Sequence, residues 1–509
     1  MTYQTDSSAL IELKNGRFFD VINGKYFASG TRVFIKEGKI QLVLSNENSS
    51  DNYGKAAFSI DLKGKTVLPG LFNTHCHIHM TTPSWFATFK DVLAWNRNHE
   101  KQKIRNMAEC LAHGVTNIRD SYTENLSATQ QLKSEIERGK IPGPRIQQAV
   151  VVGPSGSYFA EKVNFTQRIS RYSIGIPTVD HSKKNAGVIE FPVDASEQIV
   201  RDTVDRAIDE RGAEAIKIGE QLISTTTFKP DATIMSIKQL SALADQANRR
   251  GLKTIIHQIT AETFRRAVAA GVTSLAHTAS DATLSQVDID AFIAAGCIIE
   301  PTLSVQYDLV WKIKGNRYYD HPDMNRLMNF RDTVYTFDHI GNEFYTPGLR
   351  KSLKTAYEKF QNSRFKIFGT LDLSRLYKFY SGMVNHGNTN YRNLFDNGAT
   401  ISVSNDAGIP PCTPAMIGLE LALSDLILNT SDEKKYNGAD AVRMATINSA
   451  RALGLEHEFG TIEPEKTADL VVLDGDVLED VNCVGSRAAA LFMDGKLVIN
   501  NCDLQVTAL

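Results

Sequence analysis

The chain has 509 residues, of which 42% are hydrophobic and 22% charged, a composition typical of a folded protein with a large core. It excludes a disordered or fibrous chain, and the length allows either two to four domains or one large barrel with an attachment. The net charge of −2 argues against a nucleic-acid-binding or membrane-surface protein, because both depend on an excess of basic residues.

Cysteine usage and the start of the chain indicate the cellular compartment. The six cysteines are scattered and form no CxxC pair, which is typical of a reduced intracellular protein. The first residues contain neither a basic segment nor an apolar segment of a signal peptide, and no run of about 18 apolar residues is present. We therefore expect a cytoplasmic protein with no membrane partner.

Both ends of the chain show short apolar runs separated by turn sequences. Lys14-Asn15-Gly16 and Lys36-Glu37-Gly38-Lys39 are typical of tight turns between strands. Near the C-terminus, apolar runs at 470–473 and 488–493 flank similar turns. Strands at both ends of a chain with a different middle predict one composite β-sandwich domain, built from residues 1–66 and 456–509.

The middle of the chain, residues 67–455, alternates apolar runs with amphipathic helical stretches, for example 194–211, 236–250 and 261–270. Eight such alternations predict an α/β fold, a (β/α)8 TIM-like barrel. An open doubly wound sheet is the alternative, although it would normally show a Gly-rich first turn that is absent here. The eight runs are 66–72, 115–118, 146–152, 215–218, 254–256, 274–276, 297–300 and 400–403.

Two insertions interrupt the predicted barrel, at about 153–193 and about 305–380. The second is rich in Tyr, Phe and Trp, including Trp311, Tyr318 and Phe365, so it is expected to be a packed subdomain or lid. Its aromatic residues could form a local core or a subunit contact. Alternatively, they could form a wall against an apolar or aromatic part of a small-molecule substrate.

The strongest local signal is His75-Cys76-His77 at the end of the first apolar run. Side chains alternate along a strand, so the two imidazoles share a face that would line the barrel interior. Such a pair is a ready chelate for a divalent metal, while the alternative is a polar patch at a strand end. His79 has the same parity but lies past the strand, where it could remain in solvent.

Four more polar side chains lie in or directly after apolar runs: Lys217, His257, His277 and Asp406. Burial lowers the pKa of a lysine, and a neutral amine can react with carbon dioxide to give a carbamate that bridges two metals. A salt-bridged or snorkelling lysine is the alternative. With His75 and His77, these residues mark strands 1, 4, 5, 6 and 8 in barrel order, which favours one shared site.

With these residues, the chain resembles the metal-dependent amidohydrolase superfamily, in its imidazolonepropionase-like and Xaa-Pro-dipeptidase-like branch. The resemblance rests on Pro69-Gly70 leading into His75-x-His77, and on a C-terminal signature at 439–455 and 460–473. It covers nearly the whole chain. It implies a TIM-like barrel with a composite β-sandwich, and homo-oligomerisation is common in the family.

The resemblance also implies a role for each candidate residue. His75 and His77 would bind the more buried of two divalent metal ions, expected to be zinc, and carboxylated Lys217 would bridge both ions. His257 and His277 would bind the second ion. Asp406 would contact the first ion and shuttle a proton, so the implied activity is hydrolysis of an amide, a related C–N bond or an ester by metal-activated hydroxide.

Departures from the family pattern keep the substrate open. Where dipeptidase-like members tend to show Gly-Gly-His, this chain reads Gly153-Pro154-Ser155-Gly156-Ser157-Tyr158. Tyr122 and Tyr158 could each supply a phenol to the oxyanion, or simply pack. A mononuclear deaminase or imidazolonepropionase-type enzyme is the alternative function, but such relatives carry a Glu soon after the strand-5 histidine, whereas Glu262 lies five positions after His257. A non-catalytic scaffold would have lost ligands, and none is missing.

Overall fold

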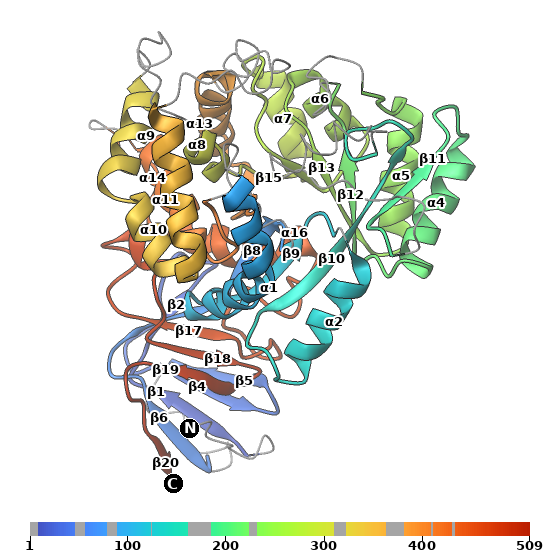
Figure 1. Ribbon diagram of the computed structural model, residues 1–509. Coiled ribbons are helices and arrows are strands. Elements are labelled where there is room, and N and C mark those ends of the chain that lie inside the picture. Colours follow the sequence, from blue (N-terminus) through green and yellow to red (C-terminus); the bar gives the residue numbers. More distant parts are fainter. Residues whose placement is uncertain are drawn as a thin grey trace.

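The structure is a computed structural model with two parts, a barrel surrounded by helices and a smaller β-domain in which both termini lie (Figure 1). The residues that the structure describes are 9–45, 56–78, 89–123, 125–160, 185–222, 232–309, 322–362, 381–408, 411–429 and 433–509.

The larger part contains a parallel sheet whose eight barrel strands follow one another in chain order. Neighbouring barrel strands pair in parallel, with register shifts between β8 and β9, and Cys76 pairs in parallel with Ala407, which joins the two edge strands. Thr74 N also donates to Val403 O at 2.9 Å across this junction. The predicted TIM-like barrel is therefore confirmed. Its strands are β8 (Leu71–Cys76), β9 (Val115–Asp120), β10 (Arg145–Pro154), β12 (Ala215–Gly219), β13 (Lys253–His257), β14 (Ser274–Ala276), β15 (Ile298–Glu300) and β16 (Thr400–Ile401).

The first predicted run, 66–72, is divided between the two parts of the molecule. β7 (Thr66–Pro69) belongs to the β-domain, where it pairs with β17 (Leu470–Leu473), and only β8 enters the barrel. Gly70 stands between them, and a Cβ on it would lie 2.3 Å from Thr116 Oγ1, closer than any side chain can approach. The chain thus changes sheets at a residue where only glycine fits, four residues beyond the predicted boundary of residue 66.

Helices follow the strands, as the sequence periodicity predicts. The predicted helices 194–211, 236–250 and 261–270 correspond to α4, α5 and α6, and Ser236 and Thr260 each begin a helix with a capping box. In the described parts of the chain, no helix combines the length and the apolar character that crossing a bilayer requires. The helices around the barrel are α1 (Phe89–Ala112), α2 (Leu126–Glu137), α4 (Glu197–Asp209), α5 (Ile237–Arg249), α6 (Ala261–Ala269), α7 (Gln286–Ala294), α13 (Asn388–Asp396), α14 (Ile417–Leu428), α15 (Gly438–Arg443) and α16 (Ser449–Leu453).

Both insertions contribute ordered elements. The first returns to the sheet as β11 (Val188–Phe191), which pairs in parallel with the end of β10. The second contributes α8 (Ser304–Leu309), α9 (Pro322–Thr333), α10 (Phe337–Phe344) and α11 (Pro347–Asn362), and the π-helical turn η3 (Met383–Gly387) follows it.

The aromatic residues described in the second insertion serve the local core. Phe337, Phe344 and Tyr345 are buried in the main hydrophobic cluster, and Gln102 of α1 donates to Phe344 O at 2.9 Å. Trp311, Tyr318 and Phe365 lie outside the described residues. The substrate wall therefore stays a prediction.

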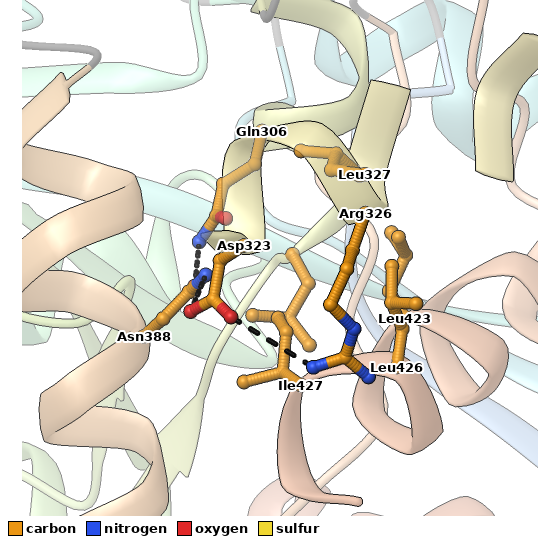
Figure 2. A pocket seen from close by; sticks show the side chains of 9 residues that line it. Gln306, Asp323, Arg326, Leu327, Asn388, Leu423, Leu426 and Ile427 are labelled. Atoms are coloured by element: carbon orange, nitrogen blue, oxygen red, sulfur yellow. Dashed lines mark hydrogen bonds and ion pairs between the residues drawn. The ribbon is translucent and has the colours of Figure 1, made fainter. Parts of the chain in front are cut away.

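A small pocket lies between α8, α9, α13 and α14 and shares no residue with the predicted site. Its polar side chains already have partners: Gln306 Nε2 donates to Asn388 Oδ1 at 2.8 Å, and Asp323 pairs with Arg392 at 2.6 Å. Figure 2 shows Gln306, Asn388 and Asp323 turned toward one another at the pocket. We therefore interpret it as a packing gap between helices.

The β-domain consists of two sheets, with strand orders β20-β6-β1-β4-β5 and β19-β18-β17-β7-β2-β3. Side chains from both sheets, including Leu13, Val33, Val67 and Phe492, form its core. β20, from the end of the chain, pairs with β6, from its first part, so the predicted composite β-sandwich is confirmed. Its other strands are β1 (Ile11–Lys14), β2 (Arg17–Asp20), β3 (Lys25–Tyr26), β4 (Arg32–Lys36), β5 (Lys39–Leu44), β6 (Phe58–Asp61), β18 (Ala490–Met493), β19 (Lys496–Asn500) and β20 (Val506–Ala508).

Candidate metal centre

The carboxyl ends of the barrel strands bring the predicted site residues to one end of the barrel. His75 is in β8, and Lys217 in β12. His257 is the last residue of β13, and His277 directly follows β14. Asp406 follows β16, whose extension pairs with β8, so residues more than 300 positions apart in sequence become neighbours.

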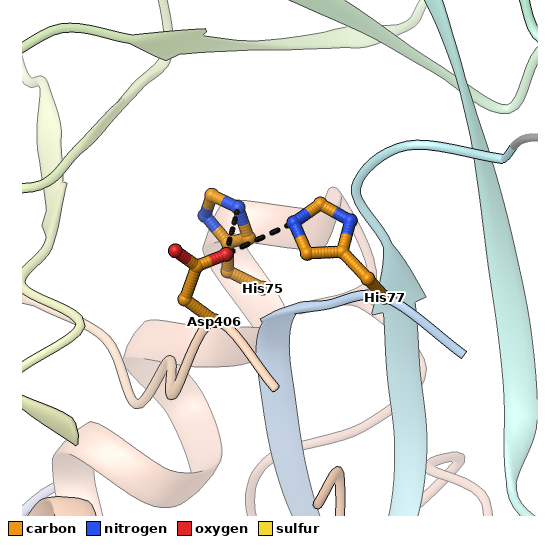
Figure 3. Close-up of side chains that lie close together, drawn as sticks. All are labelled: His75, His77 and Asp406. Atoms are coloured by element: carbon orange, nitrogen blue, oxygen red, sulfur yellow. Dashed lines mark hydrogen bonds and ion pairs between the residues drawn. The ribbon is translucent and has the colours of Figure 1, made fainter. Parts of the chain in front are cut away.

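His75, His77 and Asp406 form a buried cluster in which one atom of each lies within 4.8 Å of the others. Asp406 Oδ1 lies 2.9 Å from His77 Nε2 and 3.3 Å from His75 Nε2. Figure 3 shows both imidazoles aimed at this one carboxylate oxygen. Two imidazole nitrogens and a carboxylate oxygen that converge in this way are a suitable donor set for a divalent cation.

Backbone hydrogen bonds between β8 and the segment after β16 fix this cluster. Asp406 N donates to His75 O at 2.9 Å, and His77 N donates to Ala407 O at 2.7 Å. Asp406 has a φ of 47°, an uncommon conformation for a residue other than glycine, which turns its side chain back over β8. Asn73 donates to Asn405 Oδ1 at 2.8 Å and so ties the same two segments together.

Lys217 lies beside this cluster, with Nζ 3.4 Å from His75 Nε2. Its side chain is only 1% exposed. Burial lowers the pKa of Lys217 to about 7, although the carboxylates of Asp406 and Glu300 oppose the shift. A large fraction of this amine is therefore neutral near pH 7, the state that reaction with carbon dioxide requires.

His257 and His277 form a second pair, with His257 Nδ1 3.0 Å from His277 Nε2. The outer nitrogen of each ring faces an oxygen: His257 Nε2 lies 2.6 Å from Gln221 Oε1, and His277 Nδ1 lies 2.6 Å from Thr302 Oγ1. The Thr302 hydroxyl donates its own hydrogen to Pro301 O at 2.7 Å, so it accepts from His277. Both outer nitrogens then carry protons, and the inner lone pairs face each other as they would at a shared cation.

Burial keeps these imidazoles neutral. It lowers the pKa of His75 and of His257 well below the ordinary value, and neighbouring positive charges add to the shift. Burial also lowers the pKa of His277 to about 4, against the opposing charge of Asp406. Burial favours protonation of Asp406, but the hydrogen bond and charge of His77 hold its pKa below the ordinary value. Neutral imidazoles and a carboxylate are the forms that bind metal, so the residues present fit divalent cations.

The two predicted tyrosines lie in different surroundings. The Tyr158 ring stacks on His257, with ring centroids 4.2 Å apart and planes 10° apart. Tyr122 packs on Phe159 at 5.1 Å, in a buried cluster with Val151 and Val188. Tyr158 therefore lies directly against a candidate ligand, whereas Tyr122 belongs to the packing behind it. His79 lies outside the described residues.

The sequence reasoning missed the groups that contact the outer nitrogens of the histidines. Besides Gln221 and Thr302, these include Glu300, whose Oε2 lies 3.4 Å from His75 Nδ1 and whose other oxygen pairs with Arg119. Burial raises the pKa of Glu300, and the Arg119 guanidinium opposes that shift. The available signal was an acidic residue at the end of the apolar run 297–300.

Comparison with known proteins places the chain in a family. Residues 66–498 match the sequence profile of the amidohydrolase family. The chain belongs to this family. A crystal structure of a Xaa-Pro dipeptidase with bound methionine matches with a TM-score of 0.65 and 19% identity, over 96% of this chain and 99% of that one. At this identity the likeness shows a shared fold.

Curated relatives match over short segments. An imidazolonepropionase of Geobacillus thermodenitrificans is 30% identical over 111 residues, or 21% of this chain and 25% of that protein. A 5-methylthioadenosine/S-adenosylhomocysteine deaminase of Symbiobacterium thermophilum is 51% identical over 45 residues, or 9% of this chain and 10% of that protein. The chain thus spans a quarter or less of the length of these relatives, and the imidazolonepropionase agrees with the branch predicted from the sequence.

Proposed function

We propose that this amidohydrolase-family protein is a metal-dependent hydrolase that cleaves an amide or related C–N carbonyl bond, or an ester, in a small molecule. Two divalent ions, expected to be zinc, would be held by His75 and His77 on one side and by His257 and His277 on the other. Lys217, carboxylated by carbon dioxide, would lie between them. When bound, such ions lower the pKa of a water molecule and polarise a substrate carbonyl.

The observation that carries the two-ion form is the buried Lys217 beside His75, where its charge also acts on His257 and His277. Its Nζ is 3.4 Å from His75 Nε2, and the His75 and His277 ring centroids are 5.8 Å apart. A buried ammonium group there would repel any cation, whereas the carbamate formed from its neutral amine is an anionic ligand. The low pKa of Lys217 therefore favours a role as a ligand over a salt-bridged lysine.

Asp406 is suited to move the proton. Its Oδ1 contacts His75 and His77, while Figure 3 shows the second carboxylate oxygen pointing away from His77. This second oxygen would accept the proton of the attacking water and return it to the leaving nitrogen. The low pKa of Asp406 keeps it ionised, and therefore able to accept that proton, at neutral pH.

The aromatic cluster beside His257 supports a substrate with an apolar or aromatic portion. Tyr158 lies on His257, and the Phe159 ring centroid is 5.9 Å from Lys217 Nζ, so aromatic surface borders both. The Tyr158 phenol is also a candidate donor to the oxyanion. The dipeptidase-type histidine expected in this segment is absent, which argues against a dipeptide as the preferred substrate.

The test combines metal analysis with a substrate screen. The purified protein is analysed for metal and assayed with N-acyl amino acids, dipeptides, lactams and esters, alongside K217M and D406N. We expect two ions per chain in the parent and hydrolysis of an acylated substrate that D406N does not support. Full turnover by a parent with one ion per chain would contradict the two-ion form, and undiminished turnover by D406N would contradict the shuttle.

A mononuclear deaminase or imidazolonepropionase-type activity is the second candidate, favoured by the segments shared with those two curated relatives. Against it, Glu262, the nearest glutamate after His257, is exposed in the first turn of α6. This candidate predicts one ion per chain and a K217M variant as active as the parent. Both quantities come from the same experiment.

A further inference from the structure

Strand β15 supplies no candidate metal ligand, yet its last residue, Glu300, and Thr302 just after it each contact a histidine of a different pair. Glu300 Oε2 lies 3.4 Å from His75 Nδ1, and two residues later Thr302 Oγ1 lies 2.6 Å from His277 Nδ1. We propose that this turn, residues 300–304, positions the ligands of both metal ions, with Glu300 as the positioning residue for His75 and Thr302 for His277. The proposal rests on the proposed function.

Glu300 fixes which nitrogen of His75 carries the proton. At 3.4 Å, His75 Nδ1 and Glu300 Oε2 face each other, neither atom has a hydrogen-bond partner among the described residues, and both side chains are at most 1% exposed. A proton on Nδ1 directed at the carboxylate leaves the Nε2 lone pair free toward Asp406 and Lys217, where the cation would sit. An acceptor behind a ligand histidine both sets its tautomer and increases its basicity.

Arg119 holds Glu300 in this orientation. The guanidinium, which comes from β9 on the far side of the barrel, pairs with Glu300 Oε1 and also donates to Ala452 O at 3.0 Å. Both members of the ion pair are fully buried. With one oxygen committed to Arg119, the other oxygen of Glu300 is directed at His75, and the carboxylate has little freedom to rotate.

The second half of the turn is held just as firmly. Thr302 has a φ of 50°, which costs free energy in a β-branched residue and must be imposed by its surroundings. Glu420, fully buried on α14, accepts hydrogen bonds from Leu303 N at 2.6 Å, Ser304 N at 2.9 Å and Ser304 Oγ at 2.7 Å. These bonds fix the two residues after Thr302, so its hydroxyl stays behind His277.

The experiment measures Co²⁺ binding by titration and visible absorption in variants that each keep one ligand group. H277A keeps the His75–His77–Asp406 group, and H75A keeps the His257–His277 pair. E300Q and T302V are added separately to each background. D469N is the matched control: Asp469 is also a buried carboxylate paired with an arginine, Arg145, at the opposite, amino-terminal end of β10.

We expect a crossed pattern. In the H277A background, E300Q raises the Co²⁺ dissociation constant about 10- to 100-fold, and T302V leaves it unchanged. In the H75A background, T302V raises the Co²⁺ dissociation constant about tenfold, and E300Q leaves it unchanged. D469N alters neither. General damage to the fold would affect both groups equally, so the crossed pattern separates positioning from structural support.

E300Q leaves the Arg119 guanidinium without its counter-charge, so folding is checked by circular dichroism of the metal-free proteins. If E300Q does not fold, R119Q/E300Q removes both charges and is expected to show the same weakening. Equal effects on both groups, or no effect on either, would overturn the positioning role. A parent that binds no Co²⁺ would instead refute the proposed function, so the two failures are distinguishable.

Discussion

The low pKa of Lys217 makes loading of the metal-free protein depend on carbon dioxide and pH in a defined way. Only the neutral amine attacks carbon dioxide, and the proposed two-ion site would require the resulting carbamate. The rate at which metal-free protein regains two ions should therefore follow the neutral fraction of Lys217 when dissolved carbon dioxide is held constant. The pKa of Lys217, about 7, sets this neutral fraction at each pH.

The expected size of the effect follows from that value. With a pKa of about 7, the neutral fraction rises from about 9% at pH 6 to about 50% at pH 7 and about 91% at pH 8, a tenfold increase that levels off. A lysine with the ordinary pKa of about 10.4 would instead gain about a hundredfold over the same interval, with no sign of a plateau. The curvature between pH 6 and pH 8 therefore reports the burial of Lys217.

The assay incubates metal-free protein with Zn²⁺ at each pH, with carbon dioxide either held at a fixed concentration or removed, and follows bound metal over time. Labelling with ¹³C-carbon dioxide should give a carbamate signal that K217M lacks. Loading of two ions at the same rate without carbon dioxide, or a hundredfold rise with no plateau, would refute the reasoning about Lys217.

Three further predictions concern the remaining groups. D406N should keep its metal, because an amide oxygen can still bind, but lose about 10²- to 10⁴-fold in kcat, measured together with metal content. Removal of metal by a chelator should lower the free energy of unfolding by about 4 kcal/mol for each ion that was present at 1,000 times its dissociation constant. This loss would be measured as a fall in Tm, and an unchanged Tm would argue against bound metal. Y158F should lower kcat more than Y122F does, because Tyr158 lies on His257 whereas Tyr122 packs with Val151 and Val188; equal kcat values would remove the phenol from the mechanism.

Much of the fold could be predicted because the barrel strands are short, apolar and separated by capped helices. The predicted runs 215–218, 254–256 and 274–276 match the ends of β12, β13 and β14 to within one residue. The candidate ligands were visible for a related reason: a polar side chain in or just after a buried apolar run needs a partner, and adjacent parallel strands present their carboxyl ends together. The roles assigned to these side chains remain proposals.

The sequence could not predict what depends on closure of the barrel. The split of the run 66–72 is set by Thr116 and Asp469, which crowd Gly70 from other parts of the chain. Gln221 and Thr302, which contact the outer nitrogens of His257 and His277, are ordinary polar residues in the sequence. Only the folded structure shows that each lies 2.6 Å from its histidine. No local sequence pattern predicts either contact, because each joins residues that the register of different strands brings together.

The same reasoning explains why a strand without ligands can matter for metal binding. In a closed barrel, the segment after β15 lies between β14 and β16, so it faces ligands carried by strands on both sides. Glu300 reaches His75 on β8, and Thr302 reaches His277 after β14, while Glu420 fixes the main chain of the two residues after Thr302. A shift of this turn would therefore change the orientation of both histidines together. Under this proposal, metal affinity would be governed by a segment that touches neither ion, because it decides which imidazole nitrogens remain free to bind.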